Sequence, residues 1–156
     1  MKNILFVCTG NTCRSSMAEA LLKHFASEYP RLELVVKSAG TAASDSQGAS
    51  GNAILALQEL GIDLNPHRSQ AVTTELIEEA DLVLTMTYSH KQQLLVFKPN
   101  AAHKLFTLAE FTSRDKSRNI SDPFGGNLDT YIECRNEISF YIKKLLDIIG
   151  SQIGDD

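Results

Sequence analysis

The chain has few cysteines, no basic cluster and no long apolar run, and each absence excludes a class of protein. Its three cysteines in 156 residues are an odd number without zinc-like pairing, so neither a disulfide framework nor a metal site is expected. A net charge of −4 argues against a protein that holds nucleic-acid backbones. No segment approaches the length of a membrane span, and the first apolar run is too short for a secretory signal. We therefore expect a cytoplasmic protein without nucleic-acid or membrane partners.

The overall composition of the chain is that of one globular domain. With 43% hydrophobic and 22% charged residues and no internal repeat, the chain is expected to form a single domain over residues 1–156. Apolar β-branched runs predict strands, and apolar positions at helical spacing predict helices. The predicted strands are residues 2–7, 32–38, 81–86 and 104–108, and the predicted helices are residues 16–27, 52–60, 74–80, 89–97 and 127–149.

Strands that alternate with helices predict an α/β fold. The sheet of such a fold is parallel, helices cover both of its faces, and the crossovers are right-handed. Ligands bind outside the carboxyl ends of the strands, and the residues that follow the first predicted strand lie at that edge. Residues 8–15 are therefore the first place to look for a binding site.

Residues 8–15, Cys-Thr-Gly-Asn-Thr-Cys-Arg-Ser, have the composition of an anion-binding loop. Five residues separate Cys8 from Arg14, enough for successive backbone N–H groups to curl around one small anion. Gly10 and Asn11 tolerate the positive φ values that this curl requires. The helix that follows adds unpaired N–H groups and the positive end of its dipole, and Arg14 adds a guanidinium matched to two phosphate oxygens.

The same positive field favours the thiolate form of Cys8, which makes this residue a candidate nucleophile. An isolated cysteine at the end of a strand is usually a plain buried residue, and the spacing to Arg14 alone is not specific. The apolar strand before the loop and the amphipathic helix after it supply the context that nucleophilic chemistry requires. The Ser15 hydroxyl can donate to the thiolate, cap the helix, or do both.

The order of motifs along the chain resembles that of the low-molecular-weight protein tyrosine phosphatases. The matching residues are Cys-Thr-Gly-Asn-Thr-Cys-Arg-Ser at 8–15, Ser-Ala-Gly-Thr at 38–41, His67 and Asp122-Pro123. The resemblance implies a flavodoxin-like three-layer fold with a four-stranded parallel sheet and a two-step hydrolysis without a cofactor. It also implies phosphorylated proteins as substrates and inorganic phosphate as a product or inhibitor.

The resemblance gives the matching residues their expected roles. Cys8 would attack phosphorus and form a phosphocysteine intermediate, while the loop amides and Arg14 hold the equatorial oxygens. Asp122 would protonate the leaving group and then activate water, although Asp-Pro-x-Gly by itself is typical of a turn. The residues expected to contact the substrate are Thr9, Gly10, Asn11, Thr12, Cys13, Arg14, Ser15 and Phe124.

Three further residues, Asn11, Ser38 and His67, resemble the family's network that braces the loop, with Asn11 in a left-handed conformation. Without the resemblance, His67 would be interpreted as a surface or satisfied core histidine. The same interpretation applies to the remaining histidines, which have no metal-ligand spacing: His24, His90 and His103. Cys134 falls on the apolar stripe of the last predicted helix and is expected in the core.

Within the family, the match is closest to the bacterial protein arginine phosphatases. Thr12 stands where tyrosine-specific members usually have an aliphatic residue, and Phe124 follows Asp-Pro where they often have tyrosines. The Thr12 hydroxyl can orient a guanidinium N–H, and a planar guanidinium can lie on one aromatic ring. Phosphoarginine is therefore the predicted substrate, and phosphotyrosine is the alternative. Ser16 departs from the family, which commonly has proline there.

Two functions from other classes are weaker alternatives. An arsenate reductase needs cysteines that relay a disulfide outward, and only Cys134 lies beyond the pair in the loop. A phosphate-binding module without turnover has no need for both Cys8 and an Asp-Pro acid. The spacing of Cys8 and Cys13 also predicts a reversible disulfide under oxidising conditions.

Overall fold

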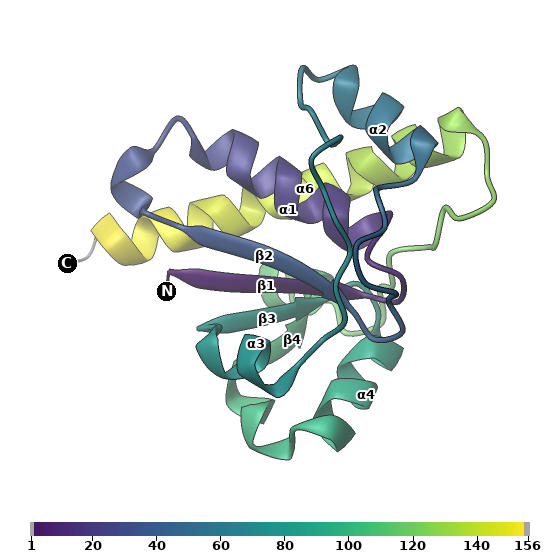
Figure 1. Ribbon diagram of the computed structural model, residues 1–156. Coiled ribbons are helices and arrows are strands. Elements are labelled where there is room, and N and C mark those ends of the chain that lie inside the picture. Colours follow the sequence, from purple (N-terminus) through teal and green to yellow (C-terminus); the bar gives the residue numbers. More distant parts are fainter. Residues whose placement is uncertain (1, 155–156) are drawn as a thin grey trace.

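Four parallel strands form the central sheet in the order β2-β1-β3-β4 (Figure 1). The computed structural model describes residues 2–154. The strands are β1 (Asn3–Cys8), β2 (Val35–Gly40), β3 (Leu82–Thr85) and β4 (Leu105–Thr107). The predicted parallel sheet is confirmed, and β1 lies in its interior because its apolar run can be buried on both faces.

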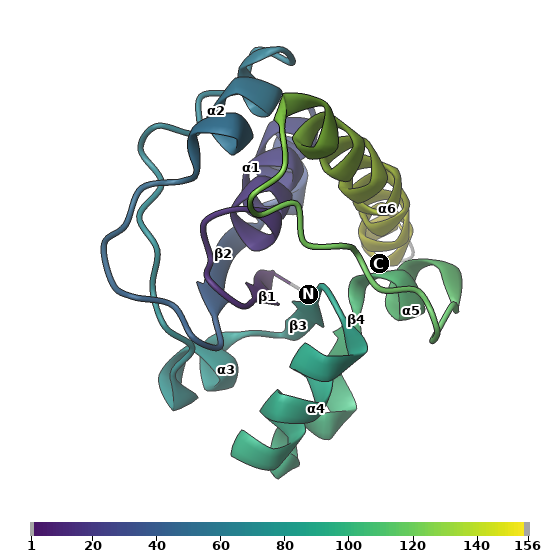
Figure 2. The ribbon, with the colours of Figure 1, turned by 90° about the vertical axis from the view of Figure 1, so that its right-hand side faces the viewer.

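Helices cover both faces of this sheet (Figure 2). They are α1 (Arg14–Ala26), α2 (Gly51–Gln58), α3 (Thr74–Glu79), α4 (Tyr88–Phe97), α5 (Leu108–Ser113) and α6 (Leu128–Gly154), with short 3-10 helices η1 (Pro30–Leu32) and η2 (Pro99–Lys104). No helix was predicted over α5, and its first residue, Leu108, was assigned to the fourth predicted strand. Thr107 and Glu110 form a capping box that starts α5, so local hydrogen bonding outweighs the weak apolar pattern there.

Alternate residues of β1 belong to the two layers of the core. Ile4 and Phe6 pack in the cluster that includes α1 and α6, whereas Leu5 and Val7 pack in the cluster that includes α3 and α4. This alternation follows from the period of two residues in a strand. The three-layer arrangement predicted from the family resemblance is therefore confirmed.

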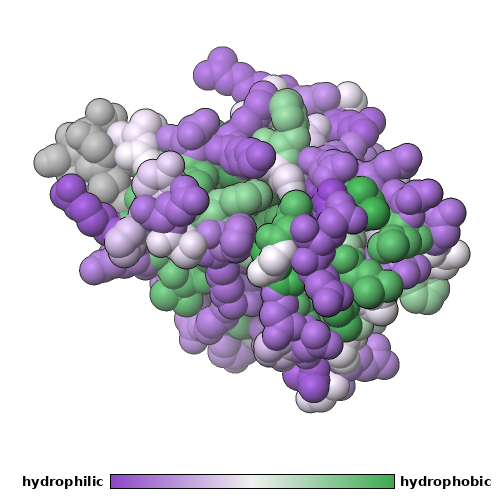
Figure 3. Space-filling model, turned by 90° about the horizontal axis from the view of Figure 1, so that it is seen from above, coloured by the Kyte–Doolittle hydropathy of each residue, from purple (hydrophilic) through white to green (hydrophobic). Residues whose placement is uncertain are grey.

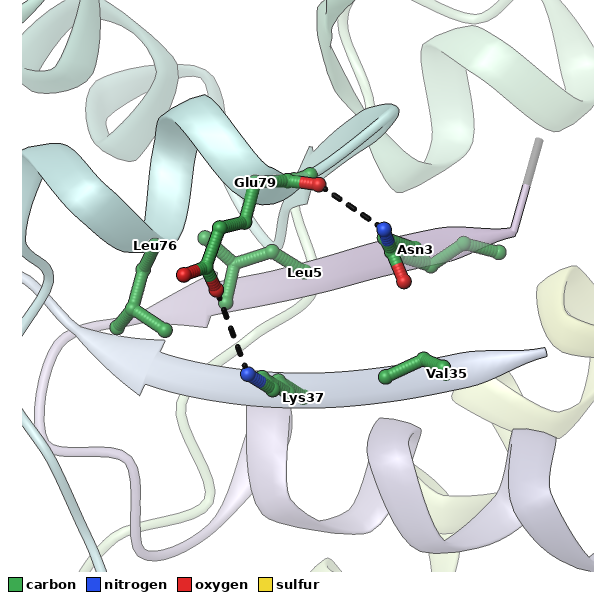
Figure 4. A pocket seen from close by; sticks show the side chains of 8 residues that line it. Asn3, Leu5, Val35, Lys37, Leu76 and Glu79 are labelled. Carbon is green, nitrogen blue, oxygen red and sulfur yellow. Dashed lines mark hydrogen bonds and ion pairs between the residues drawn. The ribbon is translucent and has the colours of Figure 1, made fainter.

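A small pocket of about 140 Å³ lies between α3 and the sheet (Figure 4). Leu5 and Leu76 contribute apolar walls, and Glu79 spans the pocket. The Glu79 carboxylate is 3.5 Å from the Lys37 ammonium, and its carbonyl accepts a hydrogen bond from the Asn3 side chain at 3.2 Å. α3 has only six residues, so it leaves this gap near the amino end of β1, opposite the end at which Cys8 lies.

The outer face over α1, α2 and α6 exposes hydrophilic and hydrophobic side chains side by side (Figure 3). Leu55 of α2 and Leu60 just after it are among the exposed apolar residues. None of the helices in residues 2–154 combines the length and the apolar character that crossing a bilayer requires.

Candidate active site

The carboxyl ends of the strands meet at one edge of the molecule, which Figure 2 views directly. There the chain leaves β1 at Cys8, curls through residues 9–13 and enters α1 at Arg14. We call residues 8–15 the Cys8 loop. The segments 41–50 and 121–127 approach the same edge, so parts distant in sequence surround the loop.

A cavity of about 280 Å³ opens above the Cys8 loop. Its floor is made by the loop, and its walls come from the segments 41–50 and 121–127. The lining residues are Cys8, Thr9, Gly10, Thr12, Cys13, Arg14, Ala42, Ser44, Gln47, Asp122 and Phe124. The structure therefore brings Cys8, Arg14 and Asp122 together, and it adds a wall over residues 42–47 that sequence reasoning missed.

Asn11 and Ser15 do not line the cavity, although both were expected to contact the substrate. Both side chains are completely buried behind the loop. Asn11 has a left-handed backbone with a φ of 59°, as the resemblance predicted. Its carboxamide N–H groups donate to the hydroxyls of Ser15 and Ser38, each at 2.8 Å. These two residues therefore support the loop.

Both oxygens of Asn11 are also paired. Its side-chain oxygen accepts a hydrogen bond from the Gln70 backbone N–H at 3.0 Å, and its carbonyl accepts one from His67 Nε2 at 2.6 Å. Ser38 in turn donates to a carboxylate oxygen of Glu19 at 2.6 Å. The predicted trio of Asn11, Ser38 and His67 is thus one connected network, with Gln70 and Glu19 as additional members.

The Ser15 hydroxyl lies 2.8 Å from the Cys8 sulfur. The Ser15 oxygen accepts an N–H from Asn11, and its own proton can go to the Cys8 sulfur or to the Ala39 carbonyl, which is farther away at 3.5 Å. A hydrogen bond of this kind favours the thiolate over the thiol. Ser15 is not a helix cap, since α1 begins at Arg14 and Cys13 occupies the cap position without a side-chain bond.

Arg14 and Asp122 supply opposite charges on two sides of the cavity. The Arg14 side chain is buried, and its Nη1 donates to the Ile120 carbonyl at 3.0 Å. Its Nη2 lies 3.6 Å from Asp122 Oδ2. Asp122 Oδ1 accepts the Phe124 backbone N–H at 3.0 Å, so the predicted turn exists and also aims the second carboxylate oxygen at the cavity. A dianion in this cavity would meet a fixed guanidinium on one side and a proton donor or acceptor on the other.

The model of the "Low molecular weight phosphotyrosine protein phosphatase" family matches residues 3–154. The chain belongs to this family. A protein-arginine-phosphatase of Bacillus subtilis (strain 168) is 46% identical over 92% of this chain and 93% of the relative. A low molecular weight protein-tyrosine-phosphatase, Ptp of Acinetobacter johnsonii, is 38% identical over 79% of this chain and 80% of the relative.

A solved structure of this phosphatase family is similar over nearly the whole chain. It is a YwlE arginine phosphatase in which serine replaces cysteine and the active-site serine is phosphorylated. The two structures superpose with a TM-score of 0.90 at 43% sequence identity, and the match covers 95% of each chain. The resemblance that the motifs predicted is therefore confirmed.

His90 is a residue of the phosphatase site that sequence reasoning missed. It was interpreted as a surface or satisfied core histidine, and it is indeed buried in the first turn of α4. Its Nε2 lies 2.8 Å from the Thr9 hydroxyl, and its Nδ1 lies 3.0 Å from the Thr87 hydroxyl. Burial, helped by the nearby Arg14, lowers the pKa of His90 to about 4. His24 and His103 are exposed.

The second cysteine of the loop and the third cysteine of the chain have different surroundings. The Cys13 sulfur lies 3.4 Å from the Tyr131 hydroxyl and 3.5 Å from that of Ser50. Burial and the neighbouring Cys13 raise the pKa of Tyr131 to about 12. Cys134 is in the core as predicted, and burial raises the pKa of its thiol to about 12.

We expect the stability of this phosphatase to fall as the pH decreases from 6.5 toward 4. The pKa of His90 is about 4 in the folded protein against an ordinary 6.5, so the unfolded state binds the proton first. The stability that the neutral imidazole contributes is complete above pH 6.5 and is lost between these values. The expected slope approaches about 1.4 kcal/mol per pH unit, measured by urea unfolding between pH 7 and pH 5.

The matched control is the substitution of a different histidine by the same residue. His90→Leu should flatten the slope between pH 7 and pH 5, whereas His103→Leu should leave it unchanged. The carboxylates with lowered pKa, such as Asp81 and Glu110, lose their contribution mainly below their ordinary values of 3.8 and 4.5. An unchanged slope in His90→Leu would show that another group is responsible.

Proposed function

We propose that this protein is a cysteine-dependent phosphatase that hydrolyses phosphoarginine in proteins. The observation that carries the proposal is the single cavity in which Cys8, Arg14 and Asp122 meet Thr12 and Phe124. The similarity to relatives named protein-arginine-phosphatase supports the same substrate. We further propose a cytoplasmic location and, as substrates, phosphorylated proteins that release inorganic phosphate.

In the first proposed step, the Cys8 thiolate attacks phosphorus in line with the leaving group. The S–P bond forms as the P–N bond breaks, and Asp122 gives its proton to the leaving guanidine nitrogen. The loop amides and Arg14 hold the three equatorial oxygens, whose charge changes during transfer. The Ser15 hydroxyl, 2.8 Å from the Cys8 sulfur, can donate a hydrogen bond to the thiolate that attacks and later leaves.

In the second proposed step, water hydrolyses the phosphocysteine intermediate. Asp122 takes a proton from the water as the new P–O bond forms, and the S–P bond breaks to regenerate the Cys8 thiolate. Phosphate then leaves the cavity. No electron is transferred, and water is the only reactant besides the substrate and the chain's own residues, so the proposed steps require no cofactor.

The polar rim of the cavity favours phosphoarginine over phosphotyrosine. Among residues 2–154, the Thr12 hydroxyl has one hydrogen-bond partner, the Cys13 sulfur at 3.8 Å, so its oxygen is available to a guanidinium N–H. Phe124 is 76% exposed and offers one uncovered ring face on which a planar guanidinium can lie. Phosphotyrosine remains the second candidate, because the tyrosine-specific relative shares the family.

The surroundings of Cys134 argue against the arsenate reductase alternative. A disulfide relay needs a thiol that is both accessible and able to ionise. Cys134 is buried, and the pKa of its thiol is raised to about 12. The chain therefore offers no suitable third thiol in its described part, and hydrolysis is the better proposal.

The substrate proposal is tested by the ratio of kcat/KM on a phosphoarginine peptide to kcat/KM on a phosphotyrosine peptide. We expect the ratio to favour phosphoarginine. Thr12→Ile should lower kcat/KM on phosphoarginine by about tenfold or more, the size of one lost hydrogen bond to a charged group. Thr74→Ile, on the other side of the sheet, is the matched control and should leave the ratio unchanged. Equal rates on both peptides, unaffected by Thr12→Ile, would refute phosphoarginine specificity.

We also propose that oxidant joins Cys8 to Cys13 reversibly, since both residues line the cavity. Peroxide oxidises the Cys8 thiolate to a sulfenic acid, and Cys13 then displaces water to form the disulfide. Mass spectrometry of peroxide-treated protein should find this bridge, and dithiothreitol should restore activity. In Cys13→Ser, the inactivation should become irreversible, whereas Cys134→Ser should behave as the unmodified protein does. Free Cys13 in the inactivated protein would rule out the bridge.

A further inference from the structure

His90 is a buried ionisable side chain beside the Cys8 loop, and the proposed mechanism gives it no task. Only 4% of its surface is exposed. It comes from α4, on the opposite face of the sheet from α1, and reaches the loop because α4 begins at the carboxyl end of β3. Its Nε2 lies 2.8 Å from Thr9 Oγ1. Thr9 directly follows Cys8 and lines the cavity, so His90 contacts the site through one intervening residue.

The hydrogen bonds around His90 decide which of its nitrogens carries the proton. Thr87 Oγ1 accepts the His90 backbone N–H at 3.2 Å, as the cap of α4, and lies 3.0 Å from His90 Nδ1. If Thr87 donates its hydroxyl proton to Nδ1, then Nε2 carries the ring proton and donates it to Thr9 Oγ1. In this arrangement one hydroxyl proton has no acceptor in residues 2–154, that of Thr9, and Thr9 is exposed and lines the cavity.

The opposite tautomer moves the unpaired proton to Thr87, which is only partly exposed and does not line the cavity. With the proton on Nδ1, the Thr87 oxygen accepts two hydrogen bonds, and its own proton has no other acceptor in residues 2–154. The Thr9 hydroxyl then donates its proton to Nε2 and cannot donate it to a ligand. A doubly protonated imidazole would take away the acceptor of Thr87 and place a second positive charge near Arg14. Burial and Arg14 disfavour that charge and lower the pKa of His90 to about 4, although Asp122 acts in the opposite direction.

We propose that His90 donates from Nε2 to Thr9 and thereby leaves the Thr9 hydroxyl proton free to donate to a phosphoryl oxygen in the cavity. His90 is then a positioning residue, and the Thr9 side chain is a substrate contact in addition to its backbone. The inference rests on the proposed function for the identity of the ligand. It adds a side-chain donor to the amides and guanidinium that hold the anion.

The position of Thr9 is fixed on its other side by backbone contacts. Its carbonyl accepts the Ala42 N–H at 2.9 Å, and a Cβ added at Gly40 would lie 2.3 Å from the same oxygen. The backbone of Thr9 is therefore held in place without His90. Loss of His90 should therefore let the Thr9 hydroxyl rotate, while the backbone of the Cys8 loop keeps its conformation.

The tautomer is tested directly by long-range ¹H–¹⁵N spectra of the imidazole nitrogens at pH 7. We expect His90 to give the pattern of a neutral ring protonated at Nε2, with assignment by the loss of its signals in His90→Leu. A ring protonated at Nδ1, or a charged ring, would overturn the proposal. This measurement requires no substrate, so it stands whether or not the protein hydrolyses phosphoarginine.

The effect on the ligand is tested by calorimetric titration of inorganic phosphate into variants. Thr9→Val and His90→Leu should each weaken phosphate affinity by about tenfold, as expected for one hydrogen bond to a charged group, and the double variant should be no weaker than the weaker single variant. Thr9→Ser keeps the hydroxyl, and His90→Gln keeps an N–H at the position of Nε2, so both should retain most of the affinity. His103→Leu is the matched control.

The outcomes separate this inference from the proposed function. If Thr9→Val binds phosphate as tightly as the unmodified protein, or if the two losses add in the double variant, the positioning role is wrong. If His90→Leu lowers the melting temperature but not phosphate affinity, its role is structural only. Shifts in phosphate affinity together with no turnover of phosphoarginine would refute the substrate proposal and leave this inference in place.

Discussion

The left-handed backbone of Asn11 is the constraint on which the Cys8 loop depends. A residue other than glycine in this conformation costs about 1–2 kcal/mol, and the φ of 59° persists because hydrogen bonds hold it. Partners from α1, β2 and the segment after α2 pair with its side-chain and carbonyl atoms. The curl that turns the loop amides inward is therefore an outcome of tertiary structure.

The parallel register of the sheet places this network beside the loop. β1 and β2 pair so that Phe6 lies opposite Ser38 and Cys8 lies opposite Gly40. Ser38 consequently reaches Asn11 from behind, while the absence of a side chain at Gly40 lets the two backbones approach. The same Asn11 side chain donates to Ser15, which lies against the Cys8 sulfur. The bracing network and the nucleophile are thus joined through shared hydrogen bonds.

Local patterns in the sequence were enough to predict the strands, most helices and the composition of the Cys8 loop. They also placed Cys134 in the core, because its position on an apolar stripe depends only on helical spacing. They failed for α5, where the capping pair of Thr107 and Glu110 starts a helix with little apolar periodicity. Its capping box was the signal that could have identified this helix.

Contacts between distant segments could not be derived from such patterns. Nothing near position 90 in the sequence indicates that its imidazole meets Thr9, since that contact depends on how α4 follows β3. The wall that includes Ser44 and Gln47 likewise lies in a segment for which neither a strand nor a helix was predicted. For Asn11, the family resemblance supplied the conformation, while the extension of its network to Gln70 and Glu19 required the structure.

The most direct measurement of the central claim is ³¹P NMR of the Asp122→Asn variant mixed with a phosphoarginine peptide. The substitution removes both the acid of the first step and the base of the second, so turnover should fall steeply, and the phosphoenzyme that forms should persist and give a phosphocysteine signal on Cys8, which digestion and mass spectrometry can assign. Cys8→Ala in the same background should give no such signal. A variant that still turns over the peptide at the full rate, or that carries phosphate on another residue, would contradict the proposed chemistry of the Cys8 loop.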